Sequence, residues 1–138
     1  MKPGKDTRTI LGIDPGTNIL GFGIIRIDAS GKPQYVDMGV LDLRKVDSPY
    51  TKLEVIHEKV GALCDLHHPD DMAIESPFYG KNAQVIFKLG RAQGAAMIAG
   101  ISTMHSYISP MANTPISLAV RMYFGGIGMD SSSSLSFA

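Results

Sequence analysis

Two acidic residues end short apolar runs in this sequence, and strand-breaking residues follow each of them. The first run reads ILGID and ends at Asp14 before a Pro-Gly pair, and the second reads DMAIE and ends at Glu75 before a Ser-Pro pair. A carboxylate at the end of a buried strand is costly unless a cation, hydrogen bonds or water compensate it. Asp14 alone is explained better as the cap of a β-turn. The repetition of the pattern at Glu75 favours a shared function.

The chemistry that suits two such acids is the binding of a divalent cation. Strands that each deliver a carboxylate at a broken end bring both side chains to one sheet edge if they are parallel neighbours. Mg²⁺ binds one or two carboxylates together with water and phosphate oxygens. We therefore expect Asp14 and Glu75 to be catalytic metal ligands in a partial Mg²⁺ site, with Mn²⁺ as a substitute.

The loop after the second acid combines two aromatic residues with a cation. This composition is typical of a site where nucleic-acid bases stack and phosphate is held. A hydrophobic lid over the core is the alternative, and the loop taken alone favours that lid. The predicted DNA-contacting residues in this loop and the helix after it are Phe78, Tyr79, Lys81, Asn82, Lys88 and Arg91.

The composition describes one α/β domain that is able to bury a core. The chain has 138 residues, of which 44% are hydrophobic and 19% are charged, and its formal net charge is zero. Nine Lys/Arg oppose twelve Asp/Glu up to Glu75, whereas four Lys/Arg oppose only Asp130 afterwards. The single Cys64 cannot form an internal disulfide, and the N-terminus lacks the apolar core of a signal peptide. These features predict a cytoplasmic protein without a membrane role.

Hydrophobic periodicity and turn residues predict four strands and two helices, with the first three strands in an antiparallel meander. Ser48-Pro49 supplies a cap and a first-turn proline for the first helix, and Asn82 caps the second. The expected strands are 9–14, 20–28, 34–43 and 71–75, and the expected helices are 49–68 and 82–102.

The second helix carries an apolar stripe and two glycines four residues apart. The residues expected to be buried on it are Ile86, Leu89, Met97 and Ile101. Gly90 and Gly94 would let this helix approach another backbone closely, either the sheet or a second subunit. After residue 102 no period is sustained, so we divide the chain into a core at 1–102 and a poorly structured segment at 103–138.

Several motifs together resemble one family, the RuvC Holliday-junction resolvases. They are LGIDPGT around Asp14, GFG at 21–23, AIE ending at Glu75, the loop with Phe78, and KLGRAQG at 88–94. The motifs follow in the family's order and spacing over about residues 10–101. A lone DPGT would be a weak signal, whereas this series is specific.

The resemblance implies a crossover junction endodeoxyribonuclease with an RNase H-like fold. That fold is a mixed sheet, an antiparallel three-strand meander plus a parallel strand, flanked by helices, and its C-terminal part is incomplete here. The resemblance also implies a homodimer that binds four-way junction DNA and nicks it symmetrically with Mg²⁺ in recombination and repair, in complex with a branch-migration helicase. Asp14 and Glu75 fall on the first two members of an acidic tetrad, Phe78 on the loop aromatic that meets junction bases, and 82–102 on the dimerising helix.

The C-terminal third departs from the family pattern. Family members carry two further carboxylates there, whereas Asp130 is the only acid after Glu75 in this chain. We interpret the sequence as a truncated or frameshifted member. A junction-binding protein impaired in catalysis is therefore an alternative to the nuclease. Phosphotransferases of the actin and sugar-kinase type also carry a DxGT motif after their first strand. They need a second domain, however, for which the chain has no room.

Overall fold

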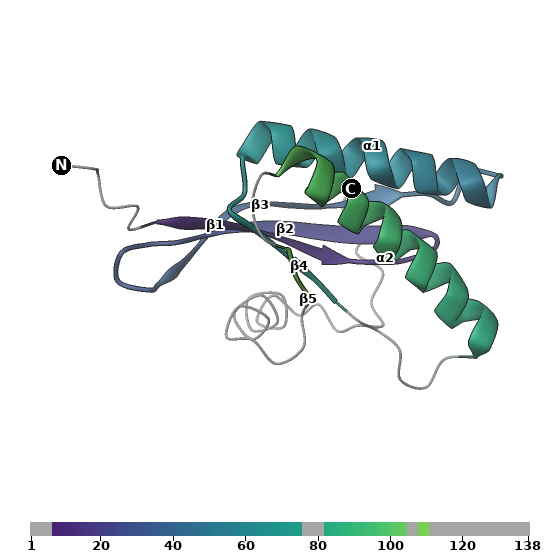
Figure 1. Cartoon of the computed structure of the whole chain (residues 1–138), viewed down its shortest axis with the longest axis horizontal. Helices are drawn as coiled ribbons and strands as arrows, with labels where there is room; N and C mark the ends of the chain where they lie inside the picture. Colours follow the sequence, from purple (N-terminus) through teal and green to yellow (C-terminus); the bar gives the residue numbers. More distant parts are fainter. Residues whose placement is uncertain (1–6, 76–81, 105–107, 111–138) are drawn as a thin grey trace.

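A five-stranded mixed sheet with two helices on one of its faces makes up the described part of the chain (Figure 1). The computed structural model describes residues 7–75, 82–104 and 108–110. The elements in chain order are β1 (Arg8–Asp14), β2 (Ile19–Ile27), β3 (Pro33–Asp42), α1 (Pro49–His67), β4 (Asp71–Ile74), α2 (Ala83–Thr103) and β5 (Ile108–Pro110).

The strands lie in the order β3-β2-β1-β4-β5. β1 pairs with β2 and β2 with β3 in antiparallel fashion, whereas β4 lies parallel to β1 on its other side, and β5 lies parallel to β4. The short links favour the hairpins, and α1 supplies the crossover that a parallel pair requires. The predicted meander with an added parallel strand is confirmed.

The hydrophobic core lies between the sheet and the two helices. Side chains alternate between the faces of a strand, so Leu11 and Ile13 of β1 point toward the helices together with Ile24 of β2. Ile56 and Val60 of α1 meet them from the other side, each with about 1% of its surface exposed. Figure 1 shows α1 and α2 covering the same face. The opposite face carries the even-numbered residues of β1, including Asp14.

Both helices begin where the sequence predicts. The Ser48 side chain accepts a hydrogen bond from the Thr51 N–H at 3.4 Å, with Pro49 in the first turn of α1. The Asn82 side chain accepts one from the Val85 N–H at 2.9 Å at the start of α2. Each cap satisfies a donor that the helix itself leaves without a partner.

The buried face of α2 differs from the predicted stripe. Leu89 is buried as expected, but the remaining buried positions are small, namely Ala92, Ala96, Ala99 and Gly100. Ile101 is 57% exposed, so its predicted burial is wrong. It lies nine positions after Ala92, which is about 180° around a helix of 3.6 residues per turn. The small residues bring α2 close to α1, and the predicted Met97 packs against the core while partly buried, whereas Phe87 and Ile98 are exposed like Ile101.

β5 lies in the segment for which the sequence predicts no regular structure. A strand of three residues is too short to show a hydrophobic period in the sequence. It forms because β4 offers it a parallel partner, with Met72 opposite Ile108. The division of the chain at residue 102 stays a prediction, since most of 103–138 lies outside the described residues. No helix in the described ranges is long and apolar enough to cross a membrane.

Candidate active site

The two predicted acids lie next to each other at the carboxyl ends of β1 and β4. These strands are parallel neighbours, and Ile13 of β1 stands opposite Ile74 of β4. The Glu75 N–H donates a hydrogen bond to the Ile13 carbonyl oxygen at 3.0 Å. This bond continues the ladder by one residue, so Glu75 follows Ile74 directly beside Asp14. The side-by-side placement that the sequence predicted is the one in the structure.

The Asp14 carboxyl is strongly perturbed by its surroundings. Its pKa is raised from the ordinary 3.8 to about 6, first because the surrounding protein removes part of its hydration. The negative charge of Glu75 adds to this effect, and the Asp14 carboxyl also hydrogen-bonds with the Glu75 side chain. Such a bond is strongest when the two carboxyls share one proton. A divalent cation would replace that proton and let both groups ionise.

The turn after Asp14 is held tightly from several sides. A Cβ on Gly16 would lie 1.8 Å from the Ile19 carbonyl oxygen, so the turn requires glycine there. The Asn18 carbonyl oxygen accepts a hydrogen bond from the Leu43 N–H at 2.7 Å. Lys52 of α1 donates from Nζ to the Asn18 Oδ1 at 3.1 Å. Sequence analysis missed Lys52, because no local pattern connects it with a turn so far away in the chain.

The donor set fits a Mg²⁺ ion. Two adjacent carboxylates, one of them readily accessible at the surface, supply the hard oxygen ligands that this cation prefers, and water or phosphate oxygens complete its shell. Within residues 7–75, 82–104 and 108–110, no group of three or more His, Cys, Asp or Glu side chains could hold a metal. Asp130, the only acid after Glu75 in the sequence, lies outside these residues.

The predicted DNA-contacting residues fall into two groups. Phe78, Tyr79 and Lys81 lie outside the described residues. The other three belong to α2 or its cap. The side-chain oxygen of Asn82 accepts a hydrogen bond from the first turn of α2, and the side chains of Lys88 and Arg91 are exposed. Asn82 therefore has the capping role that the sequence predicts, and its DNA contact stays a prediction.

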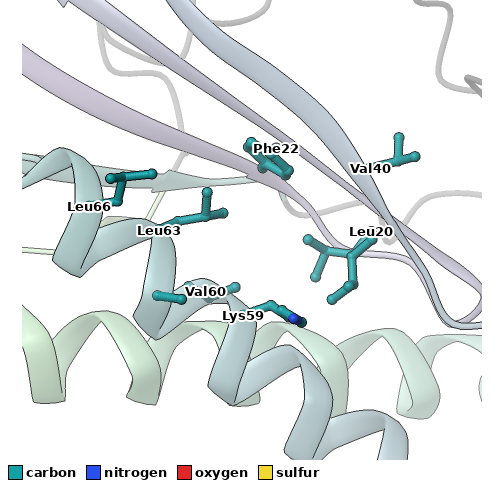
Figure 2. A pocket seen from close by; sticks show the side chains of 9 residues that line it. Leu20, Phe22, Val40, Lys59, Val60, Leu63 and Leu66 are labelled. Atoms are coloured by element: carbon teal, nitrogen blue, oxygen red, sulfur yellow. The ribbon is translucent and has the colours of Figure 1, made fainter. Parts of the chain in front are cut away.

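An apolar groove lies away from the carboxylates, between α1 and strands β2 and β3 (Figure 2). Its volume is about 260 Å³. Leu20 and Phe22 reach into it from the sheet and Leu63 from α1, while Lys59 lies at its border. No carboxylate lines the groove, so it is separate from the Asp14–Glu75 pair.

The fold and the site together define a class of protein. A mixed sheet of this order, with acids at the ends of the parallel neighbours β1 and β4, is an RNase H-like arrangement. The family model for crossover junction endodeoxyribonuclease RuvC matches residues 10–128. The chain belongs to this family.

Individual relatives agree with the family assignment. The RuvC of Bacteroides fragilis is 49% identical over 102 residues, which cover 74% of this chain and 53% of the relative. The RuvC of Christiangramia forsetii is 52% identical over 98 residues, covering 71% of this chain and 50% of the relative. The chain thus spans about half the length of the curated relatives it matches.

Solved structures show the same fold. Thermus thermophilus RuvC in complex with a Holliday junction substrate superposes with a TM-score of 0.68 at 22% identity, covering 94% of this chain and 84% of that chain. The yeast mitochondrial Holliday junction resolvase Ydc2 gives a TM-score of 0.56 at 10% identity, covering 84% and 63% of the two chains.

Proposed function

We propose that this chain carries the nuclease core of a Holliday-junction resolvase, which nicks four-way junction DNA symmetrically with Mg²⁺. The observation that carries the proposal is the juxtaposition of Asp14 and Glu75 at the ends of β1 and β4, in a chain that belongs to the RuvC family. The crossover junction endodeoxyribonucleases among the relatives and the junction bound to the Thermus protein suggest the substrate class.

Asp14 and Glu75 would hold the cation. When bound, Mg²⁺ supplies charge neutralisation for the scissile phosphate and lowers the pKa of a bound water. Asp14 contributes a carboxylate whose proton is easily released to a cation near neutral pH, because its raised pKa of about 6 still lies below 7. Glu75 is fixed by its backbone hydrogen bond to β1, so the two carboxylates stay within reach of one ion.

Junction binding is assigned to the region around α2. Lys88 and Arg91 are exposed on this helix and supply charge for phosphate contacts. Phe78, Tyr79 and Lys81 are proposed to meet bases and phosphate from the preceding loop. In the half of the chain after Glu75, basic residues outnumber acidic ones, which suits a surface that faces DNA.

A homodimer would form through α2. Phe87 is 70% exposed, Ile98 49% and Ile101 57%, and these apolar residues lie on the helix face that turns away from the core. A Cβ at Gly90 or Gly94 would meet nothing within 4 Å, so these glycines do not serve packing against the sheet. An exposed apolar stripe with small residues suits a close helix–helix contact with a second copy. Two nuclease cores would then cut two strands symmetrically.

A junction-binding protein without catalysis is the second candidate. This function is favoured because the candidate metal site has only two carboxylates. The described residues place no third acid or histidine beside them. Loss of metal ligands affects turnover more than binding that rests on phosphate contacts. Either function would place the protein with the chromosome in the cytoplasm, beside a branch-migration helicase.

A junction-cleavage assay separates the two functions. The purified chain is incubated with a labelled four-way junction with and without Mg²⁺, beside Asp14→Asn and the control Glu58→Gln, which changes an exposed acid on α1. The nuclease requires nicking that depends on Mg²⁺, survives in Glu58→Gln and is lost in Asp14→Asn. A junction that is bound but uncut by all three proteins supports the binding function. Absence of junction binding refutes both.

A further inference from the structure

Three charged residues connect β1 and β4 at the ends opposite the carboxylate pair. Arg8 at the start of β1 forms a bidentate ion pair with Asp71 at the start of β4, through Nε to Oδ2 and through Nη2 to Oδ1. Asp70 Oδ2 accepts a hydrogen bond from the Thr9 N–H at 2.9 Å, and the Asp70 N–H donates to the Thr9 carbonyl oxygen at 2.8 Å.

The Arg8–Asp71 pair lies on the same two strands and the same sheet face as the Asp14–Glu75 pair. Ile10 stands opposite Asp71, and side chains alternate along each strand, so residues 8 and 14 of β1 share a face with residues 71 and 75 of β4. Four residues separate Asp71 from Glu75, which is about 13 Å along a strand at 3.3 Å per residue. Contacts that fix the register of β1 and β4 at one end therefore determine which side chain of β4 lies beside Asp14 at the other end.

The apolar residues of these strands define the register only weakly. All four residues of β4 are buried, and so are the central four of β1, so neither strand shows the polar–apolar alternation that penalises a slip. No tight turn sets the register either, because α1 lies between the two strands. A slip of two residues would keep every side chain on its face and would still bury apolar groups.

The Arg8–Asp71 pair does penalise such a slip. Asp71 is only 3% exposed. Its carboxylate forms a bidentate pair with the planar Arg8 guanidinium, and only the observed register allows this pairing. A shift by two residues moves the guanidinium about 6.6 Å along the strand. The buried Asp71 carboxylate would then lose this partner, and an uncompensated buried charge is strongly destabilising.

We propose that Arg8, Asp70 and Asp71 form a register clamp that holds Glu75 beside Asp14. They are positioning residues, which act on the carboxylate pair through the pairing of β1 with β4. The expected effect on Mg²⁺ binding rests on the proposed function, whereas the expected effect on strand pairing does not.

The test compares the full chain with a double variant that removes the ion pair without leaving a buried charge. Arg8→Met/Asp71→Leu is set beside the control Arg44→Met/Asp42→Leu, which removes an exposed Arg–Asp pair of 2.7 Å at the end of β3. One readout is hydrogen exchange of the Glu75 amide, which is bonded to Ile13 only in the native register. The other is the Mg²⁺ concentration at half-saturation, from calorimetric titration.

In the double variant we expect Glu75 amide exchange to accelerate about tenfold relative to amides of α1. The Mg²⁺ half-saturation concentration should rise about tenfold as well, and the control should stay at the wild-type values. A folded double variant with wild-type exchange at Glu75 overturns the clamp. If wild type itself binds no Mg²⁺, the proposed function fails, and the exchange readout still decides on the clamp.

A second variant covers the case in which the double variant does not fold. Asp70→Ala removes one hydrogen bond to Thr9 and keeps the Arg8–Asp71 pair. We expect Glu75 amide exchange to accelerate about threefold, in keeping with a single hydrogen bond. Unchanged exchange at Glu75 in Asp70→Ala, together with an unfolded double variant, overturns the proposal in favour of a purely stabilising ion pair.

Discussion

Replacing Asp14 with asparagine should stabilise the fold at neutral pH while removing a metal ligand. The native protein holds the Asp14 carboxyl partly desolvated and against Glu75, so its ionised form is disfavoured and its pKa rises to about 6. Asparagine has nearly the same shape and cannot ionise. The variant therefore avoids the cost that the wild type meets when this proton leaves.

The sign and size of the effect follow from linkage. A carboxyl whose pKa is higher in the folded state binds its proton more tightly there, so its contribution to stability falls as pH rises from about 4 to above 6. A pKa displaced from 3.8 to about 6 corresponds to about 3 kcal/mol for a fully buried group. Because Asp14 is exposed at the surface, solvent screening reduces this to roughly 1 to 2 kcal/mol.

Urea unfolding at a series of pH values measures this effect. The free energy of unfolding of Asp14→Asn minus that of wild type should be near zero at pH 3.5 and should reach roughly 1 to 2 kcal/mol at pH 7.5. Taking the difference cancels the titrating groups that do not interact with Asp14, and Glu58→Gln on the exposed face of α1 serves as the control. Saturating Mg²⁺ at pH 7.5 should stabilise wild type and leave Asp14→Asn unchanged.

Two outcomes would refute this reasoning. A difference that shrinks as pH rises would mean that Asp14 is stabilised, not destabilised, in its ionised form. Equal stabilisation of wild type and Asp14→Asn by Mg²⁺ would place the cation elsewhere on the protein.

Two further predictions concern the glycine turn and the exposed face of α2. Gly16→Ala should lower the free energy of unfolding by about 3 kcal/mol in urea titrations, because the new Cβ would lie 1.8 Å from the Ile19 carbonyl oxygen. Gly94→Ala, whose Cβ would meet nothing within 4 Å in a single copy, should instead raise the free energy of unfolding of the monomer by up to about 1 kcal/mol. Ile98→Glu should convert a dimer to a monomer in sedimentation experiments, whereas Leu66→Glu, at a more exposed apolar position on α1, should not. A dimer that survives Ile98→Glu would exclude this face as the interface.

Local sequence patterns predicted most secondary structure, because the signals act over a few residues. Ser48 and Asn82 cap helices through their own side chains, and the acids at the ends of the ILGID and DMAIE runs mark where strands stop. The same reasoning failed for Ile101, since a helical period reveals that one face is apolar but not which face the sheet covers. Alanines defined the buried side of α2, and their small size gave little hydrophobic signal.

Sequence patterns alone thus identified the two carboxylates and predicted the order of the strands and helices that carry them. The motifs also indicated the family. Only the tertiary structure decided the register of β1 against β4 that places Glu75 beside Asp14. It also revealed the ion pair of Arg8 with Asp71 and the contact of Lys52 with the turn after Asp14. The physical reason is that strand pairing across a long crossover depends on contacts between distant residues, and no local pattern encodes those contacts.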